Sequence, residues 1–284
     1  KYGADILRIW VASSNYAEDL RIDYGILEQH SDSYRKIRNT FRYLLGNLND
    51  KFEDIKFSEI KLNELPELEQ FMLHKIYTLN QNFNHYFKNY DFHNLYKELL
   101  NFCTVDLSAF YFDIRKDTLY CDPIDSSKRK STLILLNIIL DSLLKWFAPI
   151  LSFTTEEIFK LISQNKKSIH LQKFLNFPEI FQNNKLNSKW AEILKIRNEC
   201  NISIEEIRAS KEIGSSLEAN LKIYLNKKFQ GITNNIDFAE ICITSNAEII
   251  YDEEQEVRVK AIKATGEKCP VCWKISQMPC IRHT

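Results

Sequence analysis

The sequence predicts a mainly α-helical protein, in which a helical bundle is followed by a small α+β domain and a C-terminal zinc knuckle. Three observations support this fold class. Apolar residues recur at spacings of three and four through most of residues 4–162, which is the period of an amphipathic helix. Alternating, β-rich stretches begin near residue 220. The last sixteen residues contain a Cys-x2-Cys pair and a Cys-x2-His pair.

The first two helices are predicted from their apolar stripes. Residues 4–12 form a short helix, which needs a domain behind it because isolated short helices are unstable. A long helix is expected from about Ser31 to residue 48. Its apolar stripe consists of Tyr34, Ile37, Phe41, Leu44 and Leu48. One position on from this stripe, a basic stripe consists of Arg35, Arg38 and Arg42, with Lys36 nearby.

Further helices complete the predicted bundle. Pro66 suits the start of a second long helix over residues 67–89, and Asp91 can cap the helix that follows. A fourth helix is expected over residues 131–147. Long helices joined by short loops pack as a bundle.

A fifth helix is predicted from a local signal. Thr154 followed by Glu157 has the spacing of a capping box. The bundle is therefore expected to extend over residues 13–162.

The second half of the chain is predicted to be a smaller, mixed unit. A helix runs through Trp190, Arg197 and Ile207, and strands are expected at residues 221–225, 238–245 and 256–264. The predicted segments are a lead helix (1–12), the bundle (13–162), a connector rich in Asn, Gln and Lys (163–188), the α+β domain (189–264) and the metal-binding tail (265–284).

Composition excludes several classes of protein. Thirty-eight Lys and Arg residues balance 38 Asp and Glu residues, so a nucleic-acid partner would have to meet a local basic face. No apolar run reaches about 18 residues, which argues against a membrane span. Seven cysteines, an odd number and partly scattered, favour a reducing cytoplasm over disulfides. No residues stand at the spacing of a catalytic set, so no catalytic residue is predicted.

The tail suits a structural metal. Cys269, Cys272, Cys280 and His283 provide four ligands in two pairs, and a two-residue spacer lets one tight turn aim two side chains at one ion. Four protein ligands would fill a tetrahedral zinc ion and leave no open position for catalysis. The alternative is an unliganded, frayed tail.

Two features suit contact with RNA. Guanidinium groups one turn apart can follow a phosphate backbone, so Arg35, Arg38, Arg42 and Lys36 are candidate contacts. Alternatively, this stripe is a solvated face, paired with acids such as Glu28, Asp32 or Asp50. Trp273, directly after a predicted ligand, can stack on an unpaired base or can instead cover the metal knuckle.

Several sequence blocks resemble the isoleucyl-tRNA synthetase family. They are YGADILRIW (residues 2–10), YRKIRNT (34–40), LLGNLND (44–50), DLSAFYFDIRKD (106–117), WFAPILSFT (146–154), IGSSLEA (213–219) and CPVCW (269–273). The blocks keep the family's order, so the resemblance covers the whole chain. The family's zinc-binding end usually has two Cys-x2-Cys pairs with a longer spacer, and this chain departs from that pattern at Cys280 and His283.

This resemblance implies an enzyme and a partner. The intact enzyme would activate isoleucine with ATP and Mg²⁺ and charge tRNA(Ile). Residues 13–162 would be its anticodon-binding domain and residues 1–12 the end of its catalytic domain. The catalytic and editing domains are missing from these 284 residues, so this fragment is expected to be inactive alone. A cytoplasmic monomer is expected. The alternatives are a stand-alone RNA-binding module and a zinc-stabilised protein-docking module.

Overall fold

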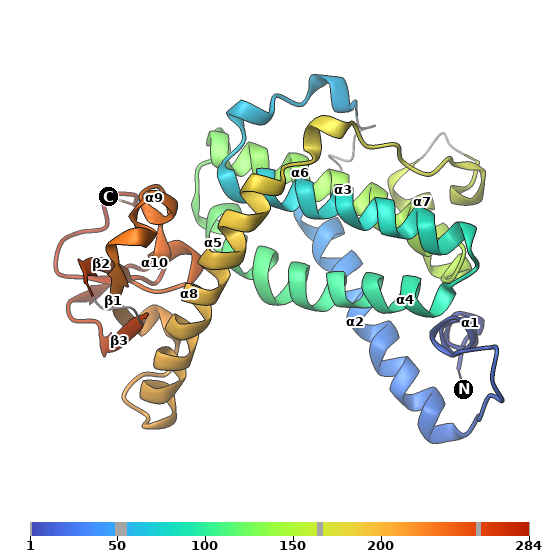
Figure 1. The fold of residues 1–284 in the computed structure, drawn as a ribbon, viewed down its shortest axis with the longest axis horizontal. Helices are drawn as coiled ribbons and strands as arrows, with labels where there is room; N and C mark the ends of the chain where they lie inside the picture. The colour runs from blue at the N-terminus through green and yellow to red at the C-terminus, as the bar shows by residue number, and fades with distance from the viewer. Residues whose placement is uncertain (1, 49–55, 164–166, 254–256, 284) are drawn as a thin grey trace. The chain divides into compact units, whose positions relative to one another are not determined.

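The computed structural model describes residues 2–48, 56–163, 167–253 and 257–283 (Figure 1). It consists of two compact units, of which the first contains residues 1–115 and 122–183 and the second contains residues 116–121 and 184–284. The five segments expected from the sequence divide the chain more finely, and their boundaries stay a prediction. Asp50, a predicted partner of the basic stripe, lies outside the described residues.

The first unit is the predicted helical bundle. Its helices are α1 (Ala4–Ser13), α2 (Tyr24–Leu48), α3 (Glu67–Lys88), α4 (Phe92–Asn101), the π-helix η3 (Phe102–Phe112), the start of α5 (Asp113–Cys121), α6 (Ser127–Phe147) and α7 (Ser152–Ile162). Short 3-10 turns lie at Phe57–Glu59, Leu62–Glu64, Ile169–Leu171 and Glu179–Phe181. Helix α3 packs against α4 and α6, and α2 packs against α1, α6 and η3.

Local signals explain where these helices begin. Helix α3 starts after Pro66, and the Asp91 side chain accepts a hydrogen bond from the Asn94 amide, as predicted. Helix α2 begins at Tyr24, earlier than the predicted Ser31, because Asp23 Oδ1 accepts a hydrogen bond from the Ile26 amide at 2.7 Å.

The predicted capping box at the start of α7 is wrong. Helix α7 begins at Ser152, so Thr154 already lies inside it. Asp5 of α1 instead accepts hydrogen bonds from the Thr154 amide (2.8 Å) and hydroxyl (2.6 Å) and from the Phe153 amide (3.3 Å). The free amides at the start of α7 are therefore capped by a side chain from another helix. This interaction attaches α1 to the bundle.

A buried ion pair lies inside the bundle. Glu69 of α3 and Arg115 of α5 have side chains that are 0% and 2% exposed. Arg115 donates two hydrogen bonds of 2.6 Å to the two carboxylate oxygens of Glu69. Tyr111 and Thr132 donate their hydroxyls to the same carboxylate at 3.0 and 3.3 Å. The Glu69 carboxylate thus accepts hydrogen bonds from three residues, Tyr111 on η3, Arg115 on α5 and Thr132 on α6.

The second unit joins a long helix to a three-stranded sheet. Its elements are the last residues of α5, α8 (Asn184–Ala209), the 3-10 turns η6 (Ser216–Glu218) and η7 (Lys227–Phe229), β1 (Ala219–Asn226), α9 (Gln230–Thr233), α10 (Phe238–Ile241), β2 (Asn246–Asp252), β3 (Arg258–Lys263), β4 (Glu267–Lys268) and β5 (Ile275–Ser276). Strand β1 is central, parallel to β2 and antiparallel to β3. Alternate residues of β1 are buried, and α8 packs on β1 and β3.

One predicted strand is wrong. Residues 238–245 were expected to be extended, but residues 238–241 form the short helix α10. Asp237 accounts for this, because its side chain accepts a hydrogen bond from the Glu240 amide and caps the turn. The strand follows instead at residues 246–252, where it pairs with β1. In the described ranges, no helix combines the length and the apolar character that crossing a membrane requires.

Candidate metal centre and nucleic-acid surface

The four predicted metal ligands come from two loops beside a small antiparallel pair of strands. Cys269 and Cys272 follow β4, while Cys280 and His283 follow β5. Gly266 allows the strands to approach closely. It has a φ of +127°, and a Cβ there would lie 2.2 Å from the Ser276 carbonyl oxygen. The backbone thus places two short loops, each carrying two ligands, side by side.

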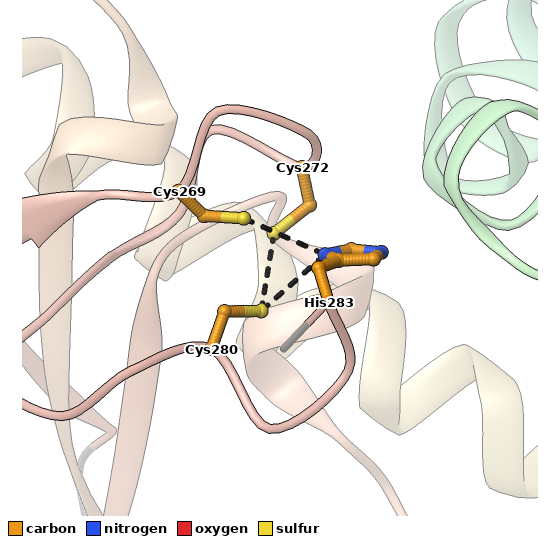
Figure 2. A group of neighbouring side chains, drawn as sticks. All are labelled: Cys269, Cys272, Cys280 and His283. Carbon is orange, nitrogen blue, oxygen red and sulfur yellow. Dashed lines mark hydrogen bonds between the residues drawn. The ribbon is translucent and has the colours of Figure 1, made fainter.

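The side chains of these four residues point toward one another (Figure 2). Their ligand atoms all lie within 4.8 Å of one another. Sγ of Cys272 is 3.8 Å from Sγ of Cys280, and Nδ1 of His283 is 3.5 Å from Sγ of Cys269 and 3.3 Å from Sγ of Cys280. Ordinary zinc bond lengths in a tetrahedron require about 3.8 Å between sulfurs and about 3.6 Å between sulfur and nitrogen. The residues therefore fit a tetrahedral metal ion.

The thiols of the first pair differ in their acidity. Backbone N–H groups of Cys272 and Val271 lower the pKa of the Cys269 thiol to about 6, because they stabilise its thiolate. Burial raises the pKa of the Cys272 thiol to about 11. These interactions favour the thiolate form of Cys269 and the protonated form of Cys272, and metal binding would displace a proton from any thiol that is still protonated.

The last turn of α5 also contacts this cluster. The Cys121 carbonyl lies 3.1 Å from Nε2 of His283, and Asp117 forms an ion pair with Arg282. Sequence reasoning missed these residues, because 162 positions separate Cys121 from His283 and 165 separate Asp117 from Arg282, and no local pattern marks them.

The predicted basic stripe lies along α2, and all four of its cations are exposed. Arg35 pairs with Asp32, as the alternative interpretation of the stripe anticipated. Arg42 and Lys36 have no carboxylate partner within the part of the chain that the structure describes. Counting only described partners, their charges are the least compensated of the stripe.

Arg38 belongs to a chain of hydrogen bonds. It donates to the Tyr34 hydroxyl at 2.9 Å and pairs with Glu157 at 3.2 Å. Tyr34 in turn lies 2.9 Å from the Thr154 hydroxyl, which donates to Asp5. Interactions with Tyr34, and to a lesser extent with Glu157, raise the pKa of Arg38. An RNA phosphate would have to compete with Glu157 for this guanidinium group.

Trp273 is exposed to solvent, with a relative exposure of 58% for the residue. The Lys268 ammonium lies 5.2 Å from the centre of its ring, within the range of a cation–π interaction. The backbone of Trp273 has a φ of +63°, a left-handed conformation that bulky residues rarely adopt. A cavity of about 430 Å³ opens beside the metal ligands, and Lys268, Lys274 and Met278 contribute to its lining.

Comparisons with known proteins agree with the helical bundle. A family model described as "Anticodon-binding domain of tRNA ligase" matches residues 69–225. The chain is 68% identical over 284 residues to an isoleucine–tRNA ligase of Pelagibacter ubique (strain HTCC1062), a match that covers 100% of this chain and 31% of that protein.

More distant relatives carry the same name. Isoleucine–tRNA ligases of Bradyrhizobium diazoefficiens and Natranaerobius thermophilus are 41% and 36% identical to this chain. These matches cover 97% and 96% of the chain, and 28% and 31% of the relatives. The chain thus spans about a third of the length of the curated relatives it matches.

Proposed function

The chain belongs to the family of tRNA ligase anticodon-binding domains, and from this premise we propose that it is the tRNA-recognition portion of an isoleucine–tRNA ligase. The family match over residues 69–225 carries this proposal. The names of relatives that match nearly the whole chain support isoleucine as the amino acid of the intact enzyme. The intact enzyme would work in the cytoplasm as a monomer, bind ATP and Mg²⁺ outside these residues, and charge tRNA(Ile). The present portion alone would not catalyse the reaction.

We propose two separate surfaces for contact with tRNA, one on α2 of the first unit and one on the metal-bearing tail of the second. Arg42 and Lys36 are the first candidates for phosphate contacts. Neither has an ion-pair partner among the described residues, so neither has to break an ion pair to bind a phosphate. Arg35 and Arg38 can join only by exchanging Asp32 and Glu157 for phosphate. An anticodon loop suits such a surface, because its unpaired bases can be read directly while its phosphates bind cations.

The proposed cofactor is one structural zinc ion, held by Cys269, Cys272, Cys280 and His283. Three sulfurs and one imidazole form a donor set that zinc favours, and the separations given above fit its bond lengths. When bound, the ion supplies structural cross-linking and no chemistry, because four protein ligands leave no open position. The tail can then present Trp273 as a stacking platform.

Replacement of Arg42 by alanine is expected to flatten the salt dependence of tRNA binding. If Arg42 contacts one phosphate, the slope of log K against log salt should fall in magnitude by about 0.7–0.9. The measurement is a fluorescence titration of an isoleucine tRNA transcript at several salt concentrations. The control is Arg208→Ala, which removes an exposed arginine that pairs with Glu205 on α8. An Arg42→Ala slope equal to that of the control would contradict this contact.

Replacement of Trp273 by alanine should weaken tRNA binding without changing the salt slope. Stacking of one base on an aromatic ring is worth about 1–3 kcal/mol, whereas an indole neutralises no phosphate. Trp273→Phe should retain most of the affinity and serves as the matched control.

The same titration tests the function as a whole. It is repeated with a transcript whose anticodon is altered. Equal affinity for both transcripts, in the wild-type chain, would contradict the proposed recognition of the anticodon.

A further inference from the structure

The metal-binding tail is attached to a distant segment of the chain within the second unit. This segment is the last turn of α5, residues 117–121, which we call the docking turn. Its residues Cys121 and Asp117 contact the tail. The Cys121 carbonyl lies 3.1 Å from Nε2 of His283, the Cys121 thiol lies 3.6 Å from the Val271 carbonyl oxygen, and Asp117 accepts hydrogen bonds from Arg282.

The contact with Cys121 determines which nitrogen of His283 can bind a metal. A backbone carbonyl can only accept, so Nε2 must carry the proton in this hydrogen bond. In a neutral imidazole, Nδ1 then holds the lone pair. Nδ1 is also the atom that lies 3.5 Å from Cys269 Sγ and 3.3 Å from Cys280 Sγ. The docking turn therefore orients the imidazole in the tautomer that the metal requires.

The contact between Asp117 and Arg282 fixes the residue next to this ligand. Both side chains are about one-third exposed, with relative exposures of 33% and 32%. The second amino group of Arg282 also donates to the Asp117 carbonyl oxygen at 3.4 Å. Arg282 directly precedes His283, so this pair holds the backbone that presents the imidazole.

We propose that the docking turn is the outer support of the metal site, so that metal binding by the tail and ordering of residues 117–121 are coupled. This inference rests on the metal centre proposed above. Coupling follows from geometry, because the tetrahedron needs Nδ1 in one place and the docking turn holds the opposite side of the same ring. Asp117 is a positioning residue, which acts on the metal through Arg282 and His283.

The coupling is tested on the full 284-residue chain with zinc alone as the probe. Zinc affinity is measured by competition with a chromophoric chelator, and hydrogen exchange is measured at amides 118–121 with and without zinc. In the wild type, zinc should slow exchange at these amides. Asp117→Asn should weaken zinc binding by about two- to fivefold, the usual effect of weakening a partly exposed ion pair.

Two further variants separate coupling from a general loss of structure. Asp125→Asn removes an exposed carboxylate four positions after the docking turn in the sequence and should leave zinc affinity unchanged. Exchange of the pair, with Asp117→Arg and Arg282→Asp in one chain, should recover affinity that each single change loses. A general structural defect would not be repaired in this way.

The possible results have distinct meanings. If the wild type binds no zinc, the metal site itself is wrong and the coupling with it. If the wild type binds zinc but Asp117→Asn binds it as tightly as Asp125→Asn does, the coupling alone is wrong. Exchange at amides 118–121 that is indifferent to zinc would also overturn it.

Discussion

Replacement of Glu69 by alanine is expected to destabilise the helical unit by about 3–5 kcal/mol, the usual cost of removing one partner from a buried ion pair. The change leaves the Arg115 guanidinium group buried without its carboxylate. The hydroxyls of Tyr111 and Thr132 lose an acceptor as well. A loss of this size is a large fraction of the free energy of unfolding of a typical domain.

The effect is measured by urea unfolding, with hydrogen exchange of peptides from α3 and α6 as the readout for this unit. The matched control is Glu64→Ala, which breaks an exposed pair with Lys61 and should cost less than about 1 kcal/mol. Replacement of both buried partners, in Glu69→Leu/Arg115→Met, should restore stability relative to Glu69→Ala, because no buried charge remains. A loss for Glu69→Ala as small as that of the control would contradict the importance of this pair.

The bundle was predictable because its signals are local. The apolar stripe of α2, the start of α3 after Pro66 and the cap at Asp91 all depend on residues within one or two turns of each other. The capping box failed for the opposite reason. The hydroxyl of Thr154 bonds to Asp5, which lies 149 positions away. A sequence pattern cannot show that a side chain from another helix satisfies the same amides.

The same distinction applies to the candidate site. The spacing of the tail predicted which four side chains gather, because each pair is placed by one turn. It could not predict the support of His283 by Cys121, 162 positions away. The positions of the stripe's arginines on α2 were also predictable, but the pairing of Arg38 with Glu157 of α7 depends on how two helices pack. Features set by residues close in sequence were predictable, whereas contacts between residues far apart in sequence were not.

Removal of zinc is expected to unfold the tail and leave the helical bundle intact. Among residues 267–283, only Cys269 and Cys272 are buried, so this segment has almost no apolar core of its own. Structural zinc contributes about 10–16 kcal/mol of apparent binding free energy in small zinc-folded peptides, far more than two buried side chains can supply. Its loss should therefore release residues 267–283.

The measurement is hydrogen exchange before and after treatment with a strong chelator, alongside metal analysis of the purified chain. About one equivalent of zinc is expected in the wild type and none in a Cys269→Ser/Cys272→Ser control, because two of the four ligands are lost. Chelation should speed exchange across residues 267–283, and added zinc should reverse the change. Peptides from α3 provide the internal control, since their core consists of apolar helix packing and should not respond. Protection of the tail that persists after the zinc has been removed would show that the metal does not hold this segment.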